Sequence, residues 1–376
     1  MKWEYKTLDQ LGTVSRGKSK HRPRNDPKLF GGKYPFIQTA DVKNADYYIT
    51  KYSDTYNESG VAQSKLWDKG TLCITIAANI ADTGVLAFPA CFPDSIMGFV
   101  PFEGVANTRF IKYCFDRLQR DCKQISQGTA QDNLSWEKLS TIKFCIPEYK
   151  EQCRIADILS AYDDLIENNQ KQIKLLEEAA QRLYKEWFVD LRFPGHENTK
   201  IVDGVPEGWS RGLLKELISV NYGKDHKKAP DDGNIPVYGS GGLMRKCNKS
   251  LFSGEAVLIP RKGSLNNIMY VDETFWTVDT MFYATMKQPH TAVFVYFFVK
   301  AFDMYSMNIG AAVPSMTTKI LDAMDVVIPD KETLEKFDKY AKVYFNKIKT
   351  LQGQNEQLKT ARDLLLPKLM SGEVEV

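Results

Sequence analysis

This chain of 376 residues has few cysteines and histidines, the side chains that most often bind zinc. It contains seven cysteines and four histidines, and no two cysteines stand in a Cys-x-x-Cys spacing. Because zinc sites use such closely spaced ligands, we expect no metal site in this chain. Each cysteine is expected to be a small buried side chain in a reducing cytoplasm.

Long apolar runs are also missing. None approaches the roughly 20 apolar residues that span a bilayer, and the opening segment MKWEYKTL has no apolar signal core. We therefore expect a cytoplasmic protein that does not contact a membrane. The charge balance excludes a chain that is basic throughout, because 50 Lys and Arg against 47 Asp and Glu give a net charge of only +3.

The motifs of several enzyme classes are absent. The glycine-rich run at 238–242 has neither the G-x-G-x-x-G pattern nor the lysine of a phosphate-binding loop, so we interpret it as a strand-ending turn. The chain has no Asn/Asp-Pro-Pro-aromatic methyltransferase motif and no Gly-x-Ser-x-Gly elbow. Asp132 with Glu148 and Lys150 is the nearest approach to a nuclease cluster, and the second half has no counterpart. The sequence therefore predicts a non-catalytic chain that binds no cofactor itself.

The chain does contain a second copy of its own pattern. At an offset of 182 residues, identical residues recur in order: Gly128/Gly310, Ala130/Ala312, Leu139/Leu321, Pro147/Pro329, Tyr162/Tyr344, Ile166/Ile348, Leu176/Leu358 and Leu183/Leu365. The beginnings match at an offset of 206, as in Trp3/Trp209, Gly17/Gly223 and Lys18/Lys224. So long a period indicates two complete modules, the second of them shorter, with most of the loss upstream of the pair Gly70/Gly254.

Both modules have the pattern of an α/β globule. Short apolar or β-branched segments predict strands at 34–37, 71–76, 85–88 and 97–100, and at 235–238, 256–259, 268–271 and 281–285. Helices are predicted at 109–120 and 292–302. The expected fold is mixed α+β: two tandem α/β domains at 1–148 and 193–330, with long helices at 149–192 and 331–376, as a pseudo-twofold internal repeat.

The two long helices carry heptad seams over about five repeats. Because each helix is too long to pack only on its own globule, we expect the two to form an antiparallel coiled coil. The main seam residues are Ile155, Tyr162, Ile166, Ile173, Leu176, Leu183, Tyr344, Ile348, Leu351, Leu358 and Leu365. Asn169 and Asn355 interrupt the seams, either as polar residues that fix the register or as simple solvated positions.

Basic residues gather directly after the repeated glycines. These residues are Lys18, Lys20, Arg22 and Arg24 in the first module and Lys224, Lys227 and Lys228 in the second. One such run alone is usually a solvated loop, but its duplication favours contact with phosphates.

Other loops differ between the modules and are suited to reading base edges. The residues proposed for this role are Asn79, Gln127, Thr129, Gln131, Ser240, Arg261, Lys262, Asn266 and Asn267. The segment 126–133 is equally consistent with a helix-capping turn before residues 135–139. A scaffold that repeats while its loops differ suits two domains that each recognise a different short base sequence.

Together these segments resemble the specificity subunits of type I restriction-modification systems. The resemblance rests on Gly-Thr-Ala-Gln-Asp-Asn-Leu-Ser at 128–135, Phe-Cys-Ile-Pro at 144–147, the helix at 151–188, Val-Pro-Glu-Gly-Trp at 205–209 and the tail at 364–372. It implies two target recognition domains, each reading one half of an asymmetric bipartite site in double-stranded DNA. The second module departs from the pattern at 310–315, where the polar residues of the first are absent.

The resemblance also implies the partners. Modification subunits, two in the usual assembly, would bring S-adenosylmethionine, and restriction subunits would bring ATP and Mg²⁺, while this subunit itself does no chemistry. Two alternatives stay open at this point. One is a stand-alone coiled-coil scaffold that binds nucleic acid, and the other is a nicking or methylating enzyme with fused recognition domains.

Overall fold

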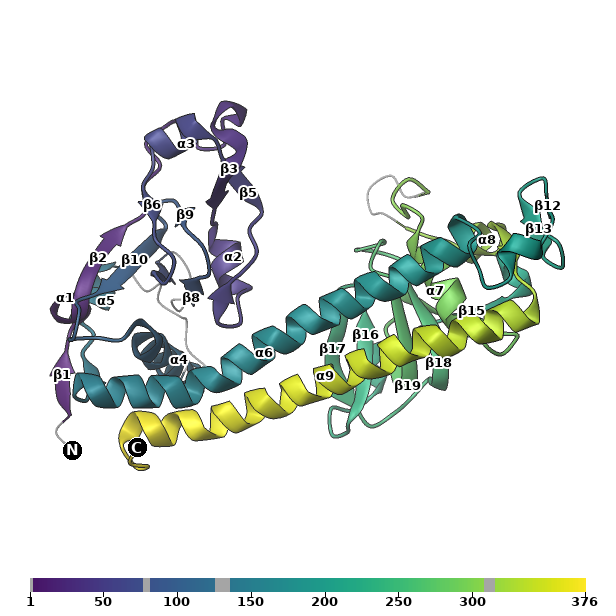
Figure 1. Cartoon of the computed structure of the whole chain (residues 1–376). Helices are drawn as coiled ribbons and strands as arrows, with labels where there is room; N and C mark the ends of the chain where they lie inside the picture. Colours follow the sequence, from purple (N-terminus) through teal and green to yellow (C-terminus); the bar gives the residue numbers. More distant parts are fainter. Residues whose placement is uncertain (1–2, 77–81, 126–135, 308–314) are drawn as a thin grey trace. The chain divides into compact units, whose positions relative to one another are not determined.

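The computed structural model describes residues 3–76, 82–125, 136–307 and 315–376. The chain divides by its contacts into two compact units (Figure 1): the first comprises residues 1–170 and 352–376, and the second comprises residues 171–351. Each long helix therefore contributes part of its length to each unit. The linear domain limits drawn from the sequence stay a prediction.

The first unit contains two sheets beside a long helix. The larger sheet has the order β2 (Gly12–Arg16), β10 (Ile96–Pro101), β7 (Leu72–Thr75), β8 (Thr83–Leu86) and β4 (Tyr48–Ile49). The smaller one has the order β5 (Asp54–Tyr56), β3 (Phe30–Phe36), β9 (Ala90–Cys91) and β6 (Leu66–Trp67). Two further strands pair separately, β1 (Glu4–Lys6) with β11 (Phe144–Ile146). The helices of the globule are α1 (Leu8–Leu11), α2 (Thr39–Lys43), α3 (Glu58–Ala62), α4 (Thr108–Ile125) and α5 (Trp136–Thr141).

The second unit has one larger sheet. Its order is β15 (Ile218–Tyr222), β20 (Met281–Met286), β18 (Phe252–Pro260), β19 (Met269–Thr277), β16 (Ile235–Gly239) and β17 (Gly242–Cys247). Two separate pairs are β14 (Ser210–Leu213) with β21 (Asp325–Ile328), and β12 (Ile201–Val202) with β13 (Val205–Pro206). The helices are α7 (Ala292–Lys300), which is apolar on nearly all sides and almost wholly buried, and α8 (Thr318–Asp322).

Strand pairing confirms the internal repeat. Glu4 lies opposite Ile146 in the first unit, and Ser210 lies opposite Ile328 in the second, which are the same partners under the two sequence registers. The sheets agree as well, since Val14 pairs with Phe99 as Val220 pairs with Ala284. In both units the antiparallel pair that follows, β3 with β5 or β16 with β17, joins a later strand in parallel: β3 pairs with β9, and β16 pairs with β19. The two units therefore share one topology.

The extra residues of the first module lie upstream of Gly70, as the sequence predicts. In the first unit, α2 and β4 are inserted between β3 and β5, and α3 and β6 precede β7. In the second unit, β16 and β17 are joined by a tight turn at Ser240 and Gly241, which confirms the strand-ending turn at 238–242. All eight predicted strands are present. The strands β18 and β19 extend furthest beyond their predicted lengths, because their polar ends pair with each other, as Gly254 does with Glu273.

The two long helices are confirmed as an antiparallel pair. They are α6 (Tyr149–Tyr184), which continues as a π-helix over Lys185–Val189, and α9 (Lys331–Ser371). In the first unit Asn169 contacts Asn355, and in the second Trp187 contacts Phe337 with ring centroids 5.9 Å apart, so the end of one helix meets the start of the other. None of the predicted seam residues is exposed: Ile155, Ile166, Ile348 and Leu351 are buried, and Tyr162, Ile173, Leu176, Leu183, Tyr344, Leu358 and Leu365 are half-buried.

The solvated interpretation of the two seam asparagines is wrong. Asn169 and Asn355 are each 7% exposed, and the Asn169 amide donates to Asn355 Oδ1 over 2.9 Å. They form one polar layer of the helix pair in the first unit. Among the described residues, no helix is long and apolar enough to cross a membrane.

Candidate nucleic-acid interface

Both repeated glycines stand where the backbone of another segment comes too close for any side chain. A Cβ atom on Gly223 would lie 2.0 Å from the carbonyl oxygen of Val278, and one on Gly17 would lie 2.3 Å from that of Phe92. Such distances are far inside van der Waals contact, so only glycine fits at either position. The repeated glycine is therefore a packing requirement that sets where the following basic loop begins.

The lysines that follow these glycines lie at equivalent points of the two units. The Lys18 amide donates to the carbonyl of Phe92 over 3.0 Å, and the Lys224 amide donates to that of Thr277 over 2.9 Å. Phe92 directly follows β9 and Thr277 ends β19, so both lie just before the strand that pairs with β2 or β15. Both lysine side chains are exposed, which is compatible with their predicted contact with phosphates.

A second pair of equivalent lysines was not found from the sequence. Asp26 Oδ1 accepts from the Lys28 amide over 3.0 Å, and Asp225 Oδ1 accepts from the Lys227 amide over 3.0 Å, each at the start of a 3₁₀ turn that leads toward β3 or β16. Lys28 is therefore the structural counterpart of Lys227. The sequence does contain the shared pattern Asp-x-Lys. Because the loop of the first module is longer, this pattern lies farther from Gly17 than its counterpart lies from Gly223.

The two arginines of the first run are held by contacts within the unit. Lys20 is exposed. The Arg22 guanidinium donates to the carbonyls of Ser19 and His21 over 2.7 and 2.9 Å, while Arg24 forms an ion pair of 2.8 Å with Asp94. Arg24 would have to exchange this carboxylate for a phosphate in order to bind DNA.

The first variable loop begins at the same backbone position in each unit. The Ile76 amide donates to the carbonyl of Ser95 over 3.1 Å, and the Arg261 amide donates to that of Thr280 over 2.8 Å. The Arg261 guanidinium lies 5.5 Å from the ring centroid of Tyr222. The frame is thus the same, but an aliphatic residue stands in one unit where a cation stands in the other.

Two of the predicted base-reading amides hold the second unit's loop in place. Asn266 donates to Asp303 over 3.0 Å and accepts from the Met304 amide over 2.8 Å. Asn267 donates to the carbonyl of Ser240 over 2.8 Å. The bond from Asn267 joins the loop at 261–268 to the turn at Ser240. Lys262, whose side chain is exposed, pairs through its backbone with Ser315 in an isolated antiparallel β-bridge. A direct base contact by any of these residues stays a prediction.

Several predicted site residues lie outside the part of the chain that the structure describes. They are Asn79, Gln127, Thr129, Gln131 and the side chain of Lys228, and the two interpretations of residues 126–133 therefore stay open.

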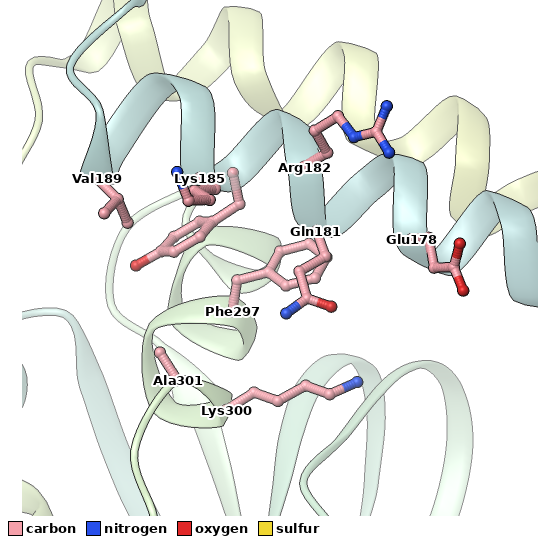
Figure 2. Close-up of a pocket in the computed structure, with 9 residues that line it drawn as sticks. Glu178, Gln181, Arg182, Lys185, Val189, Phe297, Lys300 and Ala301 are labelled. Atoms are coloured by element: carbon pink, nitrogen blue, oxygen red, sulfur yellow. The ribbon is translucent and has the colours of Figure 1, made fainter.

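A cavity of about 450 Å³ lies in the second unit, between the end of α6 and α7. Figure 2 shows Phe297 of α7 facing α6, with Gln181 and Arg182 on α6, Lys185 on the π-helix that continues it, and Lys300 on α7. Both lysines are engaged, Lys185 with Asp190 over 2.6 Å and Lys300 with the Tyr296 hydroxyl over 2.6 Å. The described residues contain no cluster of three metal ligands.

Comparison with known proteins agrees with this geometry. The family model of the type I restriction modification DNA specificity domain matches residues 1–178 and 206–360. The MjaIX type I restriction enzyme specificity subunit of Methanocaldococcus jannaschii is 26% identical over 421 aligned residues, covering 100% of this chain and 94% of that protein. The HindI specificity subunit of Haemophilus influenzae is 23% identical, over 64% of this chain and 71% of its own length.

A solved structure shows the same fold. The crystal structure of the S subunit of the M. genitalium type I restriction-modification system superposes with a TM-score of 0.60 at 19% identity, covering 98% of this chain and 96% of that one. The family model matches both of the repeats that the strand registers define. The chain therefore belongs to the family of type I restriction-modification DNA specificity subunits.

Proposed function

We propose that this chain reads an asymmetric bipartite site in double-stranded DNA, with one half-site per unit. The observation that carries the proposal is the equivalence of Ile76 and Arg261, which begin different loops from the same backbone hydrogen bond. A shared frame with different loop chemistry suits two readers of different sequences, because side chains at base edges carry the sequence information. The exposed lysines Lys18, Lys28, Lys224 and Lys227 would bind phosphates and orient each unit.

The chemistry would belong to partner subunits. Modification subunits would bind S-adenosylmethionine and methylate a base in the site, and restriction subunits with ATP and Mg²⁺ would cleave. This division of labour is supported by the family membership, since the matched family is defined by DNA specificity. Metal-dependent cleavage of DNA by the purified chain alone would contradict it.

The test is to map methylated bases in DNA from cells that carry the full chain with its modification partner. We expect two short defined sequences separated by a gap of constant length and variable sequence. Arg261→Ile, which places the residue of the first unit in the second, should change one half-site and leave the other intact. Lys200→Ile removes a cation from another exposed position of the same unit and should change neither. A single contiguous site, or an Arg261→Ile change that alters both halves, would refute the proposal.

A further inference from the structure

The helix pair of the first unit contains a second buried polar layer, which is charged. Asp163 is 3% exposed and forms an ion pair with Arg362 of α9. The Tyr113 hydroxyl donates to Asp163 Oδ2 over 2.5 Å, and Arg362 also contacts Asp363 over 2.9 Å. Burial raises the pKa of the Asp163 carboxyl, while Arg362 opposes that rise. Tyr113 of α4 thus supplies a hydrogen bond to the carboxylate, but the positive charge that compensates it comes from Arg362 of α9.

The internal repeat shows what occupies the corresponding layers of the second unit. Because the helices are antiparallel and repeat at 182 residues, the contact of Asn169 with Asn355 corresponds to Leu351 with Ile173. By the same rule, Asp163 and Arg362 correspond to Phe345 and Ala180. Ala180 is fully buried and Phe345 packs on the same core cluster. The polar layers of one unit are therefore apolar in the other.

This asymmetry bears on which helices can pair. Since α6 and α9 carry the same heptad seam, α6 could in principle pair with α6 of a second copy in the same geometry. In that pair Asn169 would face Ile173 of the other copy, and Asp163 would face Ala180. Each mismatch occurs twice, so two amides would be buried without a partner and two carboxylates would be buried without a compensating positive charge, which is unfavourable. The same holds for α9, where Asn355 would face Leu351 and Arg362 would face Phe345.

We propose that the layers Asn169–Asn355 and Asp163–Arg362 select the helix partner: they stabilise the pairing of α6 with α9 and disfavour the pairing of either helix with its counterpart in a second copy of this chain. Each layer would select the partner through the buried polar groups that a wrong pair leaves unsatisfied. This inference is independent of the proposed DNA recognition, because it concerns the assembly of the chain alone.

The test exchanges the charges of the second layer in the full chain. Asp163→Arg alone and Arg362→Asp alone place like charges opposite each other, whereas the double variant restores a pair within one chain. We expect wild type and the double variant to be monomers by light scattering. Co-expression of the two single variants should give a one-to-one dimer, because each α6 then finds its complementary α9 only in the other chain.

The asparagine layer has its own test. Asn169→Leu with Asn355→Ile introduces the residues of the corresponding apolar layer, so pairing between copies no longer buries unpaired amides. The dissociation constant of the dimer, from sedimentation at several concentrations, should fall about tenfold. Asn168→Leu, at an exposed neighbouring position, is the control and should leave it unchanged.

Three results would overturn the proposal. The first is that the single charge variants remain monomers with the stability of wild type. The second is that no dimer forms on their co-expression, whether or not each variant is soluble by itself. The third is that the asparagine double variant dimerises no more strongly than wild type.

Discussion

At the scale of single residues, close backbone approach explains the repeated glycines without any appeal to DNA. Gly223→Ala forces a methyl group against the carbonyl of Val278, which cannot rotate away. We expect a loss of about 1–3 kcal/mol in the free energy of unfolding, typical of overpacking, measured by denaturant titration. Gly241→Ala is the matched control, because nothing lies within 4 Å of the added Cβ atom there. Equal stability of the two variants would contradict the packing argument.

Lys28 and Lys227 are the cations whose equivalence only the structure shows. Because both are exposed and lie in an aspartate-capped turn, alanine at either should weaken binding to all DNA sequences similarly. The slope of log affinity against log salt should fall by about one per lysine, measured by fluorescence anisotropy of the complex with its modification subunits. Lys43→Ala and Lys200→Ala remove exposed cations elsewhere in the same units and serve as controls. A change in half-site sequence rather than in overall affinity would assign these lysines to base reading.

At the scale of elements, the start of α9 is stabilised by one carboxylate. Asp330 Oδ1 accepts from the Thr333 amide over 2.9 Å, and Oδ2 accepts from the Trp209 indole over 2.9 Å. Burial by itself would raise the pKa of Asp330, but these hydrogen bonds outweigh it and lower that pKa below its ordinary value of 3.8. The folded state therefore favours the ionised carboxylate, which joins the helix to β14 through its neighbour Trp209.

The lowered pKa predicts a pH dependence of stability. A carboxyl with a lower pKa in the folded state stabilises the protein above its unfolded pKa, and this contribution is lost as the pH falls through the folded pKa. Asp330→Asn keeps a good helix cap but cannot ionise, so wild type should be the more stable at pH 7, by up to about 1 kcal/mol. Urea titrations should show this advantage shrinking below about pH 4. A difference that is the same at pH 3 and pH 7 would show that the carboxylate charge contributes nothing.

At the scale of the whole molecule, the repeat predicts that helix length and base reading are separable. Copying residues 171–177 after Gln170 and residues 352–358 after Leu351 adds one heptad to each helix and keeps the seam. The helix pair should lengthen by about 10 Å, or about three base pairs of duplex. Methylation mapping should then show the same half-sites with a wider gap.

The same insertion placed in α6 alone is the control. It leaves the two helices unequal in length and should abolish methylation of the bipartite site. An altered half-site with an unchanged gap in the double insertion would contradict the separation of helix length from reading.

Much of this architecture was predictable because its signals are local or periodic. The offsets of 182 and 206 residues are properties of the sequence order, and strand pairing reproduces both of them. Heptad seams likewise predict two long helices and their buried faces, since hydrophobic periodicity follows from helix geometry alone. The strand ends were less predictable, because polar residues such as Glu273 extend a strand only when a partner like Gly254 lies opposite.

The sequence by itself thus determined that the chain contains two modules of the same topology and that two long helices pair with each other. Only the tertiary structure decided that Lys28 corresponds to Lys227, that Asn266 holds its own loop, and that Asn169 meets Asn355. The physical reason is range. Periodicity along a chain records what each element can bury, whereas hydrogen bonds between distant segments depend on which backbones approach one another, and that depends on the packing of the whole unit.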